Sequence, residues 1–170
     1  MANTKSPFVT DLEKATPNLS NVRRFGGRKR VLLEQYEKPA GVAPGDTHEL
    51  MVVDAHWVPL GMFYWATAAA SDTADLGIWS WNPKSDPGTL GKDDRLIDAL
   101  NLTVSNVSPI NVMGIGVNSM KPEDYGEAFW EIADQSEPGR GTEYVIVLKY
   151  VTTGGIATRL NFALEYTAGD

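Results

Sequence analysis

The C-terminal part of the chain constrains the fold most, because its apolar residues recur at every second position. The first run covers residues 142–151, and its apolar side comprises Tyr144, Ile146, Leu148 and Tyr150. The second run places Ile156, Thr158, Leu160, Phe162, Leu164 and Tyr166 on one side. A period of two is typical of β-strands, whose successive side chains point to opposite faces. Since Gly154 and Gly155 separate the runs, the pattern predicts a long hairpin. One face should lie in a core, and the face from Ala157 to Glu165 should be solvated.

Shorter apolar runs separated by Gly and Pro predict further strands. The candidates are residues 28–37, 49–53, 61–70, 74–81 and 112–117, with loops over 38–46 and 82–91. In the first candidate, the apolar side is expected to comprise Val31, Leu32, Leu33 and Tyr36. Asp93–Leu100 is expected to be a short helix, because Leu96, Ile97 and Leu100 have helical spacing. Pro122–Ala133 is expected to be a second helix, with Pro122 in its first turn. Many strands without a β-α-β alternation predict an all-β fold, a β-sandwich or jelly roll with one or two short inserted helices.

The N-terminal segment differs from the rest in both pattern and charge. Residues 1–27 show no sustained period, so we expect an extended arm (1–27) followed by one sandwich domain (28–170). Residues 1–38 hold eight Lys or Arg against four Asp or Glu, whereas the remainder holds seven against eighteen. The basic side chains gather at Arg23, Arg24, Arg28, Lys29 and Arg30. A basic arm on an acidic body favours contact with an acidic protein surface over nucleic acid, which the body would repel.

The sequence offers little for catalysis or cofactor binding. It has no Cys, which excludes disulfides, thiolate metal sites and Cys nucleophiles. Of its two His, His56 stands two residues after Asp54 without a nucleophile motif, and packing explains it better than general-base chemistry. Neither Asp54 with His56 nor Asp72 with Asp75 has a recognised metal-ligand spacing. We therefore expect a protein that is not an enzyme and has no cofactor. One alternative stays open: a small sandwich hydrolase whose two catalytic carboxylates are far apart in the sequence and meet only in the folded structure.

Location is predicted from two further features of the sequence. Residues 1–8 lack the charged and long apolar regions of a secretory signal, and no apolar stretch is long enough for a membrane span. We therefore expect synthesis in a reducing cytoplasm and no membrane partner.

Aromatic residues are concentrated in the middle of the chain. Four tryptophans stand out there: Trp57, Trp65, Trp79 and Trp81. Aromatic rings buried in a sandwich core or a subunit interface are the simpler interpretation. Exposed rings on a sheet would instead stack on sugar rings and form a carbohydrate-binding surface.

The order of these segments resembles a group of small virion proteins of tailed bacteriophages. The resemblance covers roughly residues 24–167 and rests on layout and short phrases rather than on a catalytic signature. The phrases are Gly26-Gly27-Arg28-Lys29-Arg30, residues 31–36, Gly45-Asp46, Glu49-Leu50-Met51-Val52-Val53, Ala74-Asp75-Leu76-Gly77-Ile78, residues 93–102 and the Gly-Gly segment of residues 143–166. Members of the group resemble head decoration (cement) proteins with jelly-roll or β-sandwich folds.

The resemblance implies a capsid decoration protein that is made in the host cytoplasm and sits on the outer surface of the virion. Its partner would be the major capsid protein, and it would form a homo-oligomer, a trimer or a dimer. Arg23, Arg24, Arg28, Lys29 and Arg30 would be contact residues, unless they form a merely solvated charge run. The alternative is another virion component, such as a fibre, a tail part or a host-binding domain with a carbohydrate-binding aromatic surface.

Overall fold

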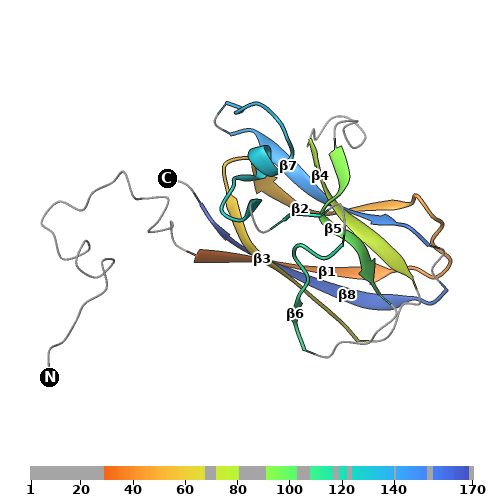
Figure 1. Ribbon diagram of the computed structural model, residues 1–170. Helices are drawn as coiled ribbons and strands as arrows, with labels where there is room; N and C mark the ends of the chain where they lie inside the picture. The colour runs from red at the N-terminus through yellow and green to blue at the C-terminus, as the bar shows by residue number, and fades with distance from the viewer. Residues whose placement is uncertain are drawn as a thin grey trace, which may run out of the picture.

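The computed structural model describes residues 29–67, 72–80, 91–102, 108–116, 119–121, 124–139, 141–152 and 155–168. Its strands form two antiparallel four-stranded sheets that face one another (Figure 1). One sheet has the order β1-β8-β3-β6 and the other β2-β7-β4-β5. The strands are β1 (Lys29–Lys38), β2 (Thr47–Asp54), β3 (Val58–Ala66), β4 (Thr73–Ser80), β5 (Gly91–Asn101), β6 (Ile110–Asn111), β7 (Glu143–Tyr150) and β8 (Thr158–Thr167). A four-residue helix, α3 (Phe129–Ile132), precedes β7. The predicted all-β sandwich is confirmed.

The strands pair in a nested way that identifies the sandwich as a jelly roll. The first strand pairs with the last, β2 with β7, β3 with β6, and β4 with β5, all antiparallel. This is the arrangement of a long antiparallel ribbon folded over onto itself, so consecutive strands in sequence fall in opposite sheets, except β4 and β5, which form the hairpin at the end of the ribbon. The jelly-roll form of the predicted fold class is therefore confirmed.

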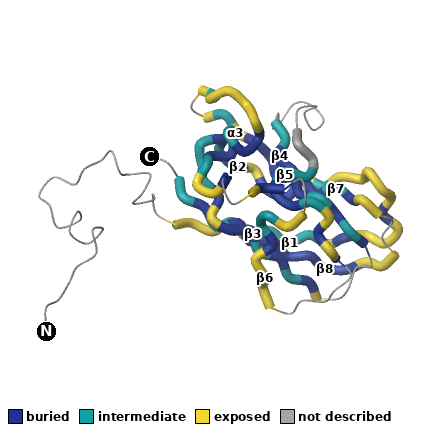
Figure 2. Tube along the Cα trace, viewed as in Figure 1, coloured by how far each residue is buried: buried dark blue, intermediate teal, exposed yellow. Residues whose placement is uncertain are grey.

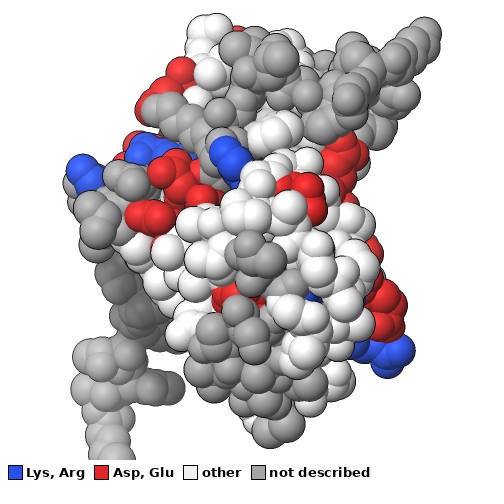
Figure 3. Space-filling model, turned by 90° about the vertical axis from the view of Figure 1, so that its right-hand side faces the viewer, with Lys and Arg blue, Asp and Glu red and all other residues white. Residues whose placement is uncertain are grey.

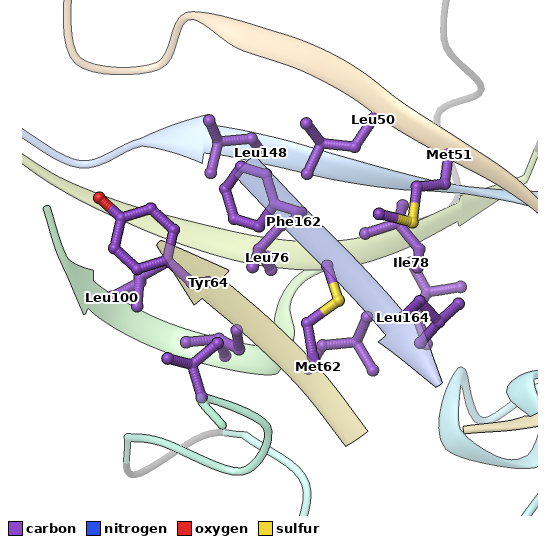
Figure 4. Close-up of a cluster of buried hydrophobic side chains, with 14 of the residues drawn as sticks. Leu50, Met51, Met62, Tyr64, Leu76, Ile78, Leu100, Leu148, Phe162 and Leu164 are labelled. Carbon is purple, nitrogen blue, oxygen red and sulfur yellow. The ribbon is translucent and has the colours of Figure 1, made fainter. Parts of the chain in front are cut away.

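The hydrophobic core lies between the two sheets. Figure 2 shows that the buried segments of the chain lie mainly in the strands, and Figure 4 shows side chains from both sheets meeting between them. Met62, Tyr64, Phe162 and Leu164 come from one sheet, and Leu76, Ile78, Leu100 and Leu148 come from the other. Full burial of a side chain of this size contributes about 1.5–3 kcal/mol. The predicted inward faces are confirmed for residues 144–150 and 158–166, whose named side chains are buried, but the prediction is wrong for Ile156, which is 46% exposed.

The predicted C-terminal hairpin is wrong, although both of its strands exist. Strand β7 pairs with β2 and β4, whereas β8 pairs with β1 and β3 in the other sheet. The chain between them therefore crosses from one sheet to the other. Both strands have partners on either side, which also changes their outer faces. On β8, Asn161 and Ala163 are buried between β1 and β3 instead of lying in solvent.

The predicted helix at Asp93–Leu100 is wrong, because this segment belongs to strand β5. Its pairing with β4 is irregular: Ile97 lies opposite Leu76, and Leu100 lies opposite Ala74. Two residues, Asp98 and Ala99, therefore oppose the single residue Asp75, which is a β-bulge. The bulge lets Ile97 and Leu100 both face the core at a spacing of three. That spacing imitates one face of a helix, which explains the error.

Two further predictions between β5 and β7 need correction. Within the described residues, the strand expected at 112–117 is replaced by the short β6 at Ile110–Asn111 and a turn over residues 112–116. That turn follows the edge of β5, with Asp98 N donating to Ile115 O at 2.8 Å. Of the helix expected over 122–133, only α3 is α-helical in the described part of the chain, and Asp124 is in a 3₁₀ turn. Gly126, at a φ of +96°, lies in the left-handed region and interrupts the segment.

Candidate interaction surface

The outer face of the β1-β8-β3-β6 sheet carries an apolar patch. Tyr64 and Phe162 point into the core, so the residues next to them in each strand point outward. Leu33, Ala163 and Phe63 are aligned across β1, β8 and β3 by the strand register. Val31 and Trp65 occupy the neighbouring rows. These five residues, Val31, Leu33, Phe63, Trp65 and Ala163, are called the outer apolar patch below.

Exposure across this patch is uneven. Leu33 is 71% exposed and Val31 is 50% exposed, which is high for apolar side chains in a sheet. Ala163 is buried because Leu33 and Phe63 flank it from the two neighbouring strands. An exposed apolar patch of this kind on a sheet marks a surface that binds another molecule.

Ion pairs lie at both ends of the outer apolar patch. Lys29 Nζ is 2.7 Å from Glu165 Oε2 at the beginning of β1, and Arg159 pairs with Glu37 at its end. Between these ends, Gln35 donates to Asn161 Oδ1, and Asn161 donates to the carbonyl of Trp65. An apolar centre with a charged and polar margin is the usual composition of a protein–protein interface.

Strand β1 is also an edge strand. In the described part of the chain it pairs with β8 on one side only. A ten-residue edge strand presents backbone N–H and C=O groups to which another chain can add a strand. The outer apolar patch and the free edge of β1 are therefore neighbouring features of one surface.

The predicted basic cluster is placed only in part. Lys29 and Arg30 begin β1 and are exposed, and Lys29 is already paired with Glu165 of the same chain. Arg23, Arg24 and Arg28, together with the arm expected over residues 1–27, lie outside the described residues. Figure 3 shows one face of the body, on which Asp and Glu outnumber Lys and Arg. This agrees with the net negative charge of the chain.

The structure does not gather the described candidate tryptophans into one surface. Trp57, at the turn from β2 to β3, is partly buried and packs against the core. Trp65 lies on the outside of the β1-β8-β3-β6 sheet. Trp79, opposite Val145, lies on the outside of the other sheet. Trp81 lies outside the described residues. Trp57, Trp65 and Trp79 therefore do not form a shared sugar-stacking platform.

The polar residues considered for chemistry have structural surroundings. Asp54 Oδ1 accepts from the backbone N–H of His56 at 2.8 Å and lies 3.3 Å from its Nδ1, which closes a turn after β2. Asp75 accepts from the N–H of Ala99 within the β5 bulge. Among the residues that the structure describes, no group of three or more His, Cys, Asp or Glu is placed to hold a metal ion.

In the described segments, no helix has both the length and the apolar character needed to cross a membrane.

Sequence reasoning missed two features of the structure. Val31, Leu32 and Leu33 were interpreted as one apolar side, but a strand divides them: Leu32 packs against the core, while Val31 and Leu33 point out. Three consecutive apolar residues in a strand indicate that both faces are apolar, which was the available signal. The second feature is a buried pair of Lys38 and Asp72. The two residues are far apart in the sequence, and nothing in the sequence links them.

Comparisons with known proteins support the fold. A chain of the solved structure "Capsid of Ralstonia phage GP4" has a TM-score of 0.56 at 15% identity, covering 85% of this chain and 87% of that one. A chain of "Cyanophage Pam1 capsid asymmetric unit" has a TM-score of 0.49 at 13% identity, covering 99% of this chain and 100% of that one. No model of a known protein family matches the chain, and no curated protein matches it. The similarity to the GP4 chain is one of fold.

Proposed function

We propose that this chain is a capsid decoration (cement) protein of a tailed bacteriophage, which binds the outer shell and stabilises contacts between major capsid protein subunits. It acts by binding and has no catalytic step. Its fold supports this role, because a phage capsid structure contains a chain of similar fold over most of its length. Fold alone does not decide function, so the proposal rests on the surface.

The observation that carries the proposal is the outer apolar patch with its charged ends. Leu33 is 71% exposed, so most of this apolar side chain is available for contact with another molecule. Burial of one such side chain against a shell contributes about 1.5–3 kcal/mol. The same contact repeated around a symmetric shell gives strong overall binding from individually weak sites. A cement protein needs this combination.

The basic residues would extend the contact beyond the sheet. Lys29 and Arg30 stand at the beginning of the edge strand, directly after Arg23, Arg24 and Arg28 in sequence. In the proposal the arm of residues 1–27 reaches across an acidic surface of the shell or of a sibling subunit. A dimer or trimer of the chain on the shell would place several arms around one symmetry axis. The protein would then reside on the outer surface of the virion.

The test uses capsid shells of the phage that encodes the chain, prepared without it. The purified chain is added to the shells, bound copies are counted after sedimentation, and shell rupture on heating is followed by light scattering. We expect binding that saturates at a fixed number of copies per shell, together with rupture at a higher temperature. Absence of saturable binding to these shells contradicts the proposal.

Two substitutions of the same kind locate the contact. Leu33→Glu puts a charge in the outer apolar patch, and we expect it to weaken shell binding at least tenfold, about 1.4 kcal/mol, without lowering the melting temperature. Val52→Glu puts the same charge on the outer face of the other sheet, where Val52 lies opposite Val145. It should leave binding unchanged. Deletion of residues 1–27 tests the arm separately: the fold should persist and binding should be lost. Equal effects of the two Glu variants would place the contact elsewhere.

A further inference from the structure

A lysine and an aspartate are buried together at one end of the sandwich. Lys38 is the last residue of β1, and Asp72 directly precedes β4 in the opposite sheet. Lys38 Nζ is 3.2 Å from Asp72 Oδ2, and both side chains are 0% exposed. The pair therefore joins the two sheets in a place that water does not reach.

The contacts of the Lys38 amine fix its orientation. Nζ donates to the carbonyl of Ile156 at 2.8 Å and to the carbonyl of Pro39 at 3.3 Å. A lysine nitrogen has three substituent positions besides its carbon. With two of them directed to carbonyl oxygens, the third is left for Asp72. When the nitrogen is neutral, that third position is its lone pair.

The surroundings of Asp72 are poor in hydrogen bonds. Although Nζ lies within ion-pair distance, neither carboxylate oxygen has a well-directed hydrogen bond from any described residue. The hydroxyl of Tyr64 is also buried without a hydrogen-bond partner in the described part of the chain. Burial raises the pKa of Asp72, an effect that Lys38 only partly offsets. Charges buried in such a place are costly to maintain without hydrogen bonds.

We propose that Lys38 and Asp72 condense spontaneously to an intramolecular isopeptide bond. The ammonium of Lys38 passes one proton to the Asp72 carboxylate, which gives an amine and a carboxylic acid. The Nζ lone pair attacks Cγ and forms the C–N bond. The C–OH bond then breaks, and the departing oxygen leaves as water with the second proton from nitrogen. One amide and one water molecule form from one ammonium and one carboxylate, and no other reactant is required.

Geometry and desolvation supply the means for this reaction. Lys38 Nζ lies 3.2 Å from Asp72 Oδ2, so the nitrogen is held beside the carboxyl group whose carbon it would attack. A lysine in an apolar site is a better nucleophile than one in water, because no hydration shell has to be removed. The folded sandwich thus holds amine and acid together at a high effective concentration.

The product would also satisfy groups that the ion pair leaves without partners. Burial raises the pKa of Tyr64 to about 12, with a smaller contribution from the Asp72 charge, so this hydroxyl lies within the electrostatic influence of Asp72 and stays a hydrogen-bond donor at neutral pH. The amide oxygen formed at Asp72 would offer the Tyr64 hydroxyl an acceptor. The bond would fasten the end of β1 to the beginning of β4, and this inference does not depend on the capsid proposal.

Intact mass spectrometry of the full chain, purified after folding and incubated at neutral pH, is the first test. We expect a mass lower than that of the sequence by one water molecule. Digestion should give one branched peptide that joins the segments containing Lys38 and Asp72. Recovery of the full sequence mass, with both residues in separate linear peptides after long incubation of the folded protein, overturns the proposal.

Variants assign the loss of water to this pair. Lys38→Met and Asp72→Ala should each retain the full sequence mass. Asp75→Ala is the matched control, because Asp75 lies opposite Lys149 across β4 and β7 as another Asp–Lys pair joining two strands. It should still lose one water molecule. Should Lys38→Met or Asp72→Ala fail to fold, the branched peptide of the unmodified chain still decides the matter. Loss of water that persists in folded Asp72→Ala overturns the assignment.

Discussion

The indole of Trp57 stacks on the ring of Tyr166, with centroids 4.1 Å apart and planes inclined by 18°. The contact joins the turn between β2 and β3 to the end of β8. It holds a connection between the two sheets against the last strand of the fold. Trp57 is thus used for packing, which agrees with the simpler of the two interpretations of the tryptophans.

Removal of this ring should lower stability. We expect Trp57→Ala to reduce the free energy of unfolding by about 2–4 kcal/mol, because it removes a large partly buried side chain and an aromatic pair. Urea unfolding followed by circular dichroism measures the change. Trp65→Ala on the outer face of the sheet is the comparison and should have a smaller effect. Equal losses from both variants would contradict the packing role of Trp57.

His48 should make stability depend on pH. Its ring stacks on Tyr36 with centroids 3.6 Å apart, and burial lowers its pKa from 6.5, although Glu34 and Glu49 oppose the shift. The folded state therefore prefers the neutral ring, whereas the unfolded chain takes up the proton more readily. Consequently, this contribution to stability is present above pH 6.5 and is lost as the pH falls below it.

His48→Phe retains an aromatic ring and removes the proton site. The difference in unfolding free energy between this variant and the unmodified chain should grow in favour of the variant from about pH 8 to pH 5. Urea unfolding at several pH values measures it. If the difference in unfolding free energy between His48→Phe and the unmodified chain did not change with pH, the His48 ring would not be the source of the pH dependence.

Gly116 is required by a close approach of two backbones. Its φ is +101°, and a Cβ built on it would lie 2.3 Å from the carbonyl oxygen of Asp98. Gly116→Ala should therefore lower the unfolding free energy by about 2 kcal/mol or more. Gly126 has a φ of +96° but open space, so Gly126→Ala should lose less. Gly139 has neither constraint, and Gly139→Ala should be neutral or slightly stabilising. Thermal unfolding ranks the three, and any other order would contradict the explanation.

Ala99 has an unfavourable backbone conformation in the β5 bulge. Its φ is +58°, in the left-handed region, while its N–H donates to Asp75 Oδ1 at 2.8 Å. Ala99→Gly should raise the free energy of unfolding by about 0.5–1 kcal/mol, because glycine adopts this conformation without strain. Ala157 is exposed and lacks a positive φ, so Ala157→Gly should be neutral or destabilising. Chemical unfolding of both variants measures this, and a loss of stability in Ala99→Gly would contradict the assignment of strain.

Much of the fold could be predicted from local patterns. The alternation at Tyr144 to Tyr150 and at Leu160 to Tyr166 identified two strands and their inward faces. Every second side chain of a strand faces the core of a sandwich, whichever strands it pairs with. The same logic failed at Leu96, Ile97 and Leu100. There, bulges shift the register of β5 against β4, and only the partner strand reveals a bulge.

The candidate surface was predicted less well than the fold. Leu33 was assigned to the core side, and its true position on the outer face depends on the register with Ala163 of β8. The tryptophans are close in the sequence but not in space, since Trp65 and Trp79 lie on opposite sheets. Proximity in space is not encoded in the spacing of these residues, so a shared site could not be inferred from it.

The sequence by itself determined that the chain forms an all-β sandwich, which residues of β7 and β8 face inward, and that Cys chemistry is excluded. These properties follow from side-chain period and composition, which act locally. Only the tertiary structure decided that β7 and β8 enter opposite sheets, that Leu33 faces solvent, and that Lys38 meets Asp72. These depend on which strands pair and in which register. Pairing is selected by the burial of the whole core at once, and no single segment contains that information.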